Sequence, residues 1–131
     1  MSLEQTIKGL KYDANGLIPA VIVDAATKAV LMVAYMNETS LLATLQTGKT
    51  HFWSRSRQKY WMKGESSGHT QEVKAIFTDC DMDTIVIEVE QHGAACHEGY
   101  YSCFYRKLTE GGDWEVIDKR LFDPAEIYRK Q

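Results

Sequence analysis

Short apolar segments, several of them alternating with polar residues, run through most of the chain and predict a strand-rich fold. The clearest alternation lies between Thr84 and Gln91, where isoleucines and a valine occupy one face and glutamates the other. Such a pattern is typical of a strand with one buried face. Further strands are expected over Ile18–Asp24, Ala29–Tyr35, His51–Arg57 and Val73–Thr78.

Turn-forming and helix-capping residues predict the turns and helices between these strands. Residues 13–16, Asp-Ala-Asn-Gly, have the composition of a turn, and we expect an opening strand before them. Asn37 can cap a short helix whose leucines recur at helical spacing, and Gly48 can end it. Near the C-terminus, a hairpin is expected around Gly111 and Gly112, pairing residues 100–108 with 114–121.

Asp123-Pro124 then has the residues that open a second short helix. The predicted fold is therefore a single α+β domain over residues 1–131, strand-rich, with a mixed, barrel-like sheet and one or two short helices. A chain of 131 residues is long enough to bury a core of its own.

Composition narrows the function classes. Hydrophobic residues make up 44% and charged residues 25%, as in ordinary globular proteins. The net charge of −3 argues against duplex DNA or an acidic membrane as the partner. No apolar run approaches the ~20 residues of a membrane span, and the N-terminus lacks the regions of a signal peptide. With only three cysteines, an odd number, we expect a cytoplasmic protein with free or metal-bound thiols.

Candidate metal ligands cluster between the two expected strands Val73–Thr78 and Thr84–Gln91. Cys80 lies among Asp79, Asp81 and Asp83. In an extended segment the three aspartates share one face and the cysteine occupies the other. Thiolates suit zinc, and carboxylates suit magnesium or calcium. The pattern therefore predicts two metal sites, back to back.

The spacing of the cysteines bears on how a zinc site is built. No Cys-x-x-Cys pair is present, which disfavours a zinc ribbon. The strand after Cys80 carries the chain roughly 25 Å away before Cys96 and Cys103. The three thiols can meet through a bent loop of one chain, or across two chains. The second arrangement predicts a symmetric dimer with metal at its interface.

Plainer interpretations stay open at this point. Buried cysteines are often only small hydrophobic residues, and three cysteines with His97 can form a closed structural zinc site. The aspartates can be a solvated loop. They also mimic a calcium loop with Glu90 in its twelfth position, but Thr84 replaces the required glycine, so we reject an EF-hand.

A basic segment with glycines and hydroxyls is the second candidate site. Strand alternation would place Arg55 and Arg57 on one face, where guanidinium groups can bind phosphate, and Lys63 adds a third charge. Ser66 and Ser67 lie between glycines in a loop that can hold an anion. A polar hairpin with solvated charges, or a stacking platform for single-stranded RNA with the nearby aromatics, fits the same residues.

Taken together, these segments resemble the phosphoribosyl-AMP cyclohydrolase family over residues 10–107. The motifs are Trp53–Arg57 (WSRSR), Trp61–Gln71 (WMKGESSGHTQ), Asp79–Asp83 (DCDMD), Cys96-His97, Ser102–Phe104 (SCF), Leu17–Ala20 (LIPA) and Leu31–Asn37 (LMVAYMN). Glu98 and Tyr100 depart from the pattern, which has small or basic residues there. Since the sequence ends at residue 131, the expected form is monofunctional, without the pyrophosphohydrolase domain often fused to this enzyme.

The resemblance implies hydrolysis of the N1–C6 bond in the adenine ring of N1-(5-phosphoribosyl)-AMP, the third step of histidine biosynthesis. It implies a homodimer whose active sites lie at the interface. Zinc would be held by Cys80, Cys96 and Cys103 from both chains, and magnesium by Asp79, Asp81 and Asp83.

A mechanism follows as a hypothesis. Three thiolates leave a fourth zinc position for a water of lowered pKa, and the resulting hydroxide attacks C6. His97 is the first candidate for the general base and His69 the second. Magnesium with Arg55, Arg57 and Lys63 would position the phosphates. The rival hypotheses are a zinc deaminase of another nucleotide, which would release ammonia, and a zinc-stabilised nucleic-acid-binding module.

Overall fold

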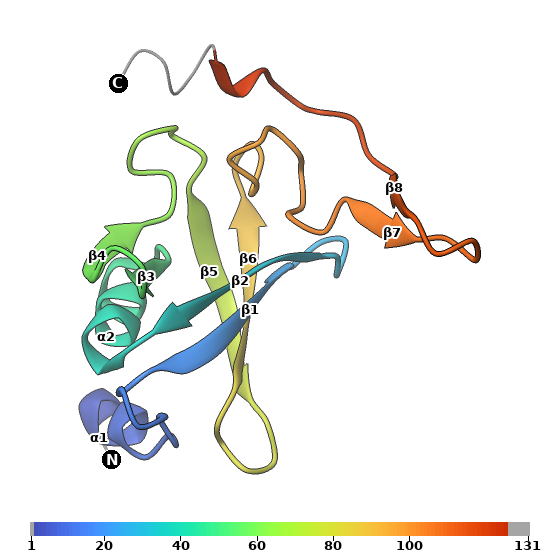
Figure 1. Ribbon diagram of the computed structural model, residues 1–131. Coiled ribbons are helices and arrows are strands. Elements are labelled where there is room, and N and C mark those ends of the chain that lie inside the picture. Colours follow the sequence, from blue (N-terminus) through green and yellow to red (C-terminus); the bar gives the residue numbers. More distant parts are fainter. Residues whose placement is uncertain (1, 126–131) are drawn as a thin grey trace.

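The computed structural model describes residues 2–125, which form a mixed sheet with two helices and a small separate hairpin (Figure 1). The helices are α1 (Leu3–Lys8) and α2 (Glu38–Thr47). The strands are β1 (Ile18–Asp24), β2 (Val30–Met36), β3 (His51–Ser54), β4 (Lys59–Met62), β5 (Gln71–Thr78), β6 (Ile85–Gln91), β7 (Arg106–Leu108) and β8 (Trp114–Val116). The strand-rich α+β prediction is confirmed.

Six strands form one curled sheet in the order β4-β3-β2-β1-β6-β5. β1 pairs antiparallel with β2 and parallel with β6, so the sheet is mixed as predicted. The register sets Ala20 opposite Ile85 and Ile22 opposite Ile87, and all four side chains are buried. Each fully buried isoleucine contributes about 2 to 3 kcal/mol relative to exposure. This core fixes β6, whose two ends carry the candidate site residues.

Capping residues account for both helices. Asn37 accepts the Ser40 backbone N–H at 2.9 Å, and Gly48 closes α2 with a positive φ of 76°, as the sequence predicts. The predicted opening strand is wrong, because α1 occupies that segment. Ser2 and Gln5 form a reciprocal capping box that starts this helix, and Ile7 anchors it in the core.

The predicted strand over residues 51–57 is too long. β3 ends at Ser54, and residues 55–58 turn back toward β4. The Arg57 backbone N–H donates to Ser54 Oγ at 3.2 Å, and Gln58 takes a positive φ of 53°. Arg55 and Arg57 therefore lie in a tight turn and do not share a strand face.

The C-terminal part of the described chain extends away from the sheet. The predicted hairpin is present but shorter, with three residues in each of β7 and β8. Residues 124 and 125 are helical, and the rest of the predicted C-terminal helix lies outside the described residues. Within residues 2–125, no helix combines the length and apolarity needed to cross a membrane.

Candidate active site

The aspartate run forms the turn that joins β5 to β6, at the lower end of the hairpin in Figure 1. The expected extended geometry is wrong, because the chain reverses here and Met82 takes a positive φ of 63°. The reversal still brings the three carboxylates together: one oxygen from each of Asp79, Asp81 and Asp83 lies within 4.8 Å of the others. A hard cation such as magnesium prefers such oxygen ligands.

The electrostatics of this turn favour a cation. Asp79 Oδ1 accepts the backbone N–H of Asp83 at 3.1 Å and of Thr84 at 3.3 Å, which holds the turn closed. The side chain of Asp81, followed by that of Asp79, raises the pKa of Asp83. Like charges this close disfavour full ionisation, and a bound divalent cation would remove that penalty.

The three cysteines do not meet within one chain. Cys80 is exposed in the β5–β6 turn, whereas Cys96 and Cys103 belong to the segment that follows β6 at its other end. The seven residues of β6 alone span roughly 23 Å. No disulfide joins the three thiols.

A tight loop, residues 96–103 and here called the thiol loop, brings Cys96 and Cys103 together as a thiol pair. The Cys96 backbone N–H donates to the Tyr100 carbonyl at 3.1 Å, and the Cys103 N–H donates to Leu31 at 2.7 Å. The two thiols are close enough to interact. Partial burial, and then the neighbouring Cys96, raises the pKa of Cys103 to about 11. The Glu98 backbone N–H donates to Cys96 Sγ at 3.4 Å.

Lys63 is the buried cation of this region. The residue is only 7% exposed, and no carboxylate of the described residues lies within ion-pair distance of it. Burial lowers the pKa of Lys63, and negative charge on Cys103 and Cys96 would oppose that shift. The sequence predicted that Lys63 binds phosphate, and this stays a prediction, since Lys63 also lines a cavity. Its side chain is buried rather than solvated and lies close to the thiol pair.

A cavity of about 410 Å³ opens in front of these groups. Six of the residues singled out from the sequence line it: Arg57, Lys63, Ser66, Ser67, His97 and Cys103. Arg55 is not among the lining residues, because its guanidinium stacks 3.9 Å from the centre of the Tyr35 ring. The cavity is large enough for most of a nucleotide.

The two candidate bases differ in their surroundings. His97 lines the cavity, is well exposed, and lies 3.2 Å from a carboxylate oxygen of Glu98. His69 is packed: its Nδ1 accepts the Ala94 backbone N–H at 3.3 Å, and its ring meets Phe122 at 4.8 Å. Gly93 lies so close that an added Cβ would be 2.5 Å from the His69 ring. His97 is therefore open to the cavity, whereas His69 is packed against the residues around Gly93.

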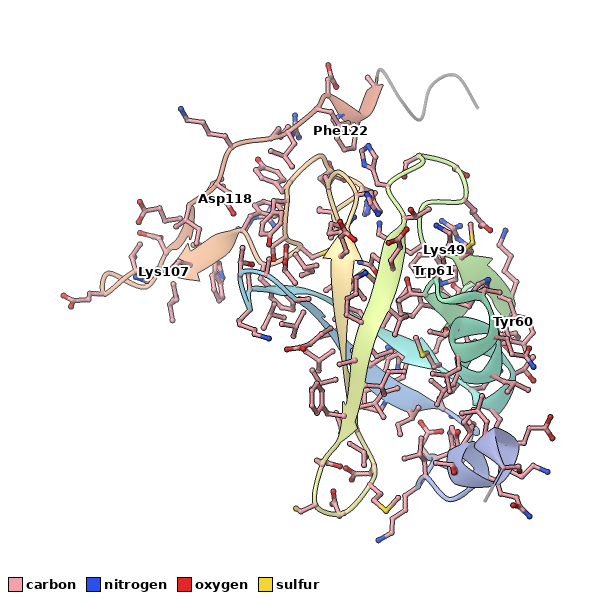
Figure 2. The ribbon with its side chains drawn as sticks, turned by 180° about the vertical axis from the view of Figure 1, so that it is seen from behind. Lys49, Tyr60, Trp61, Lys107, Asp118 and Phe122 are labelled. Atoms are coloured by element: carbon pink, nitrogen blue, oxygen red, sulfur yellow. The ribbon has the colours of Figure 1, made fainter. Side chains whose placement is uncertain are left out.

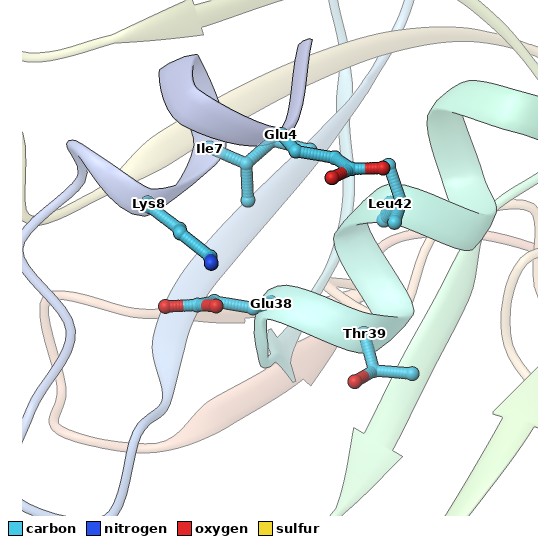
Figure 3. A pocket seen from close by; sticks show the side chains of 6 residues that line it. All are labelled: Glu4, Ile7, Lys8, Glu38, Thr39 and Leu42. Carbon is cyan, nitrogen blue, oxygen red and sulfur yellow. The ribbon is translucent and has the colours of Figure 1, made fainter. Parts of the chain in front are cut away.

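Two other polar features lie away from this cavity. A smaller hollow of about 140 Å³ between α1 and α2 is lined by Glu4, Lys8 and Glu38 among others (Figure 3). A cluster of Glu72, Glu90 and His92 was not expected from the sequence; its two glutamates are cross-strand neighbours on β5 and β6. Lys74 already supplies it with positive charge, 3.6 Å from Glu90 and 4.0 Å from Glu72.

Comparison with known proteins agrees with these features. Residues 32–105, which include the thiol loop, the basic segment and the aspartate turn, match the family model described as phosphoribosyl-AMP cyclohydrolase. Proteins of that name are 54% identical over 125 residues in Pelotomaculum thermopropionicum (95% of this chain, 97% of the relative) and 61% identical over 117 residues in Pelobacter propionicus (88% and 93%). A third, from Chlorobaculum tepidum, is 52% identical over 125 residues (95% and 91%). The chain belongs to the phosphoribosyl-AMP cyclohydrolase family.

Proposed function

We propose that the protein hydrolyses the N1–C6 bond in the adenine ring of N1-(5-phosphoribosyl)-AMP, a step of histidine biosynthesis. The observation that carries this proposal is the cavity lined by Cys103, the buried Lys63, Arg57 and two serines, with Cys96 close to Cys103. The names of the relatives point to the same substrate. We place the enzyme in the cytoplasm, because its three thiols are free.

The donor sets fit two different metals. Cys96 and Cys103 present soft sulfur ligands, and we propose that Cys80 of a second copy completes a zinc site, since Cys80 of the same chain lies at the far end of β6. The three carboxylates of the β5–β6 turn fit magnesium. Zinc, when bound with an open position, supplies a water of lowered pKa at C6.

The protein's own residues would then orient the substrate and move the proton. Arg57, Ser66 and Ser67 line the cavity and would donate hydrogen bonds to the phosphates. His97 would take a proton from the attacking water and return it to N1 as the C6–N1 bond breaks. The water oxygen stays on C6 as the carbonyl oxygen of the new carboxamide, and the second proton of the water passes to the exocyclic nitrogen on C6. The exposure of His97 leaves it free to reorient toward the substrate.

The proposal is tested with zinc-loaded protein, magnesium and N1-(5-phosphoribosyl)-AMP, by following ring opening through ultraviolet absorbance. We expect turnover that a chelator abolishes and added zinc restores, without release of ammonia. Cys96→Ser should lose both zinc and activity. A Cys96→Ser variant with full turnover would refute the role of zinc, and ammonia release would instead identify a deaminase.

A further inference from the structure

The β7–β8 hairpin, residues 106–116 and here called the arm, has two chemically different faces. Its register sets Arg106 opposite Val116, Lys107 opposite Glu115 and Leu108 opposite Trp114. Because cross-strand partners share a face and neighbours along a strand alternate, the arm has one largely apolar face and one charged face. The apolar face consists of Leu108, Trp114 and Val116, with Arg106 at its base.

The apolar face is uncovered. Trp114 is 68% exposed, Leu108 55% and Val116 50%. Among the described strands, β7 and β8 pair only with each other, and the arm extends away from the main sheet (Figures 1 and 2). A lone two-stranded hairpin is marginally stable in water, so an uncovered tryptophan here indicates a docking surface.

The base of the arm is fixed to the thiol loop. Tyr105 precedes β7, is buried, and stacks on Tyr100 with ring centres 3.7 Å apart. The Arg106 guanidinium lies 4.5 Å from the centre of the Tyr105 ring. Since Cys103 comes only three residues before β7, whatever approaches the thiol pair also approaches the arm.

The second copy is the occupant that fits. On the proposed function, on which this step rests, the zinc site is incomplete until a partner brings its Cys80. Two exposed apolar side chains lie near Cys80: Phe77 (53% exposed) at the end of β5 and Met82 (39%) in the β5–β6 turn. The turn also carries three carboxylates, which keep a net negative charge even with one divalent cation bound. That charge suits Arg106, a residue without an ion pair among the described residues.

We propose that the apolar face of the arm packs on Phe77 and Met82 of a second copy and so holds the partner's Cys80 at the thiol pair. The arm is then the clamp of a two-chain site. In a two-fold symmetric dimer this contact occurs twice, once at each of the two sites.

Light scattering on the zinc-loaded full chain tests the clamp. We expect the native protein to be dimeric, and Trp114→Ser with Val116→Ser to raise the dimer Kd at least about 30-fold and to lower bound zinc. The matched control, Lys107→Ser with Glu115→Ser, changes the charged face of the same strands and should leave both unchanged. Equal dimer Kd values for the two double variants, or a monomeric native protein, would overturn the proposal.

Cross-linking is a second test, which uses different variants and so remains informative if the double serine variants fold poorly. Trp114→Cys combined with Phe77→Cys should form a covalent dimer on mild oxidation, and Lys107→Cys with Phe77→Cys should not. Equal yields from the two pairs would overturn the clamp. If the covalent dimer forms but ring opening fails, the clamp is supported and the proposed function is refuted. If the protein opens the ring but the arm substitutions do not change dimerisation, the proposed function stands and the clamp is refuted.

Discussion

Replacing Lys63 by methionine tests what its buried charge does. Methionine nearly preserves the volume of the side chain and removes the ammonium group. Because Lys63 is only 7% exposed and has no carboxylate partner among the described residues, its charge is costly in the metal-free protein. We therefore expect Lys63→Met to stabilise the metal-free protein, by about 1 to 2 kcal/mol.

Zinc binding should respond in the opposite direction. In the proposed site three thiolates and zinc carry a net charge of about −1, which the nearby lysine offsets. At an effective dielectric constant of about 20, unit charges about 5 Å apart interact by about 3 kcal/mol, and solvent reduces this. Losing that contact should weaken zinc binding by about 10-fold to 100-fold.

The assay is competition for zinc against a chromophoric chelator, together with urea unfolding of the metal-free protein. Lys59→Met, at an exposed lysine on β4, is the matched control and should change neither quantity. If Lys63 instead contacts a substrate phosphate, as the sequence indicated, KM rises and zinc affinity stays at the native value. A variant with native zinc affinity and lower metal-free stability would refute the reasoning.

Two smaller predictions test the backbone at Gly64 and the hydrogen bond between Tyr101 and Asp24. Gly64→Ala should lower the free energy of unfolding by about 1 to 3 kcal/mol, because Gly64 has a φ of +84° and its new Cβ would lie 2.6 Å from the His69 backbone. The control Gly112→Ala, with a φ of +91° and open space around it, should lower it less. Equal shifts in the melting temperature of the two variants would contradict this prediction. A 2.5 Å hydrogen bond from Tyr101 lowers the pKa of Asp24. Its stabilisation is present above the unfolded pKa of about 3.9 and is lost as pH falls through the folded value. Tyr101→Phe should therefore be less stable than native protein at pH 6, with the gap narrowing toward pH 2; a gap independent of pH would count against the contact.

The sequence predicted best where one buried face imposes alternation. β6 is the example, since Ile85, Ile87 and Val89 are all buried. The same rule failed for the first residues, because α1 is a short helix set by its capping box and the burial of Ile7. The box Ser-x-x-Gln was readable in the sequence, but so short a helix depends on tertiary packing.

The aspartate run shows a different limit. Alternation treats every segment as extended, but aspartates favour turns because their carboxylates accept nearby backbone N–H groups. Asp79 does this with Asp83 and Thr84. The burial of Lys63 had no signal in the sequence, since neither periodicity nor spacing connects it with thiols more than 30 residues away.

The organisation of the site follows from how its parts are built. The carboxylates gather through one reverse turn, and Cys96 and Cys103 gather through one short loop, so each half is encoded locally and leaves a recognisable motif. A strand of the core separates the two halves, and a strand cannot bend enough to bring its ends together. In the proposed assembly, the rigidity that keeps Cys80 away from the thiol pair of its own chain is what presents it to another. The surface that selects the partner then lies beside the catalytic motifs, on the arm, where the motifs alone do not reveal it.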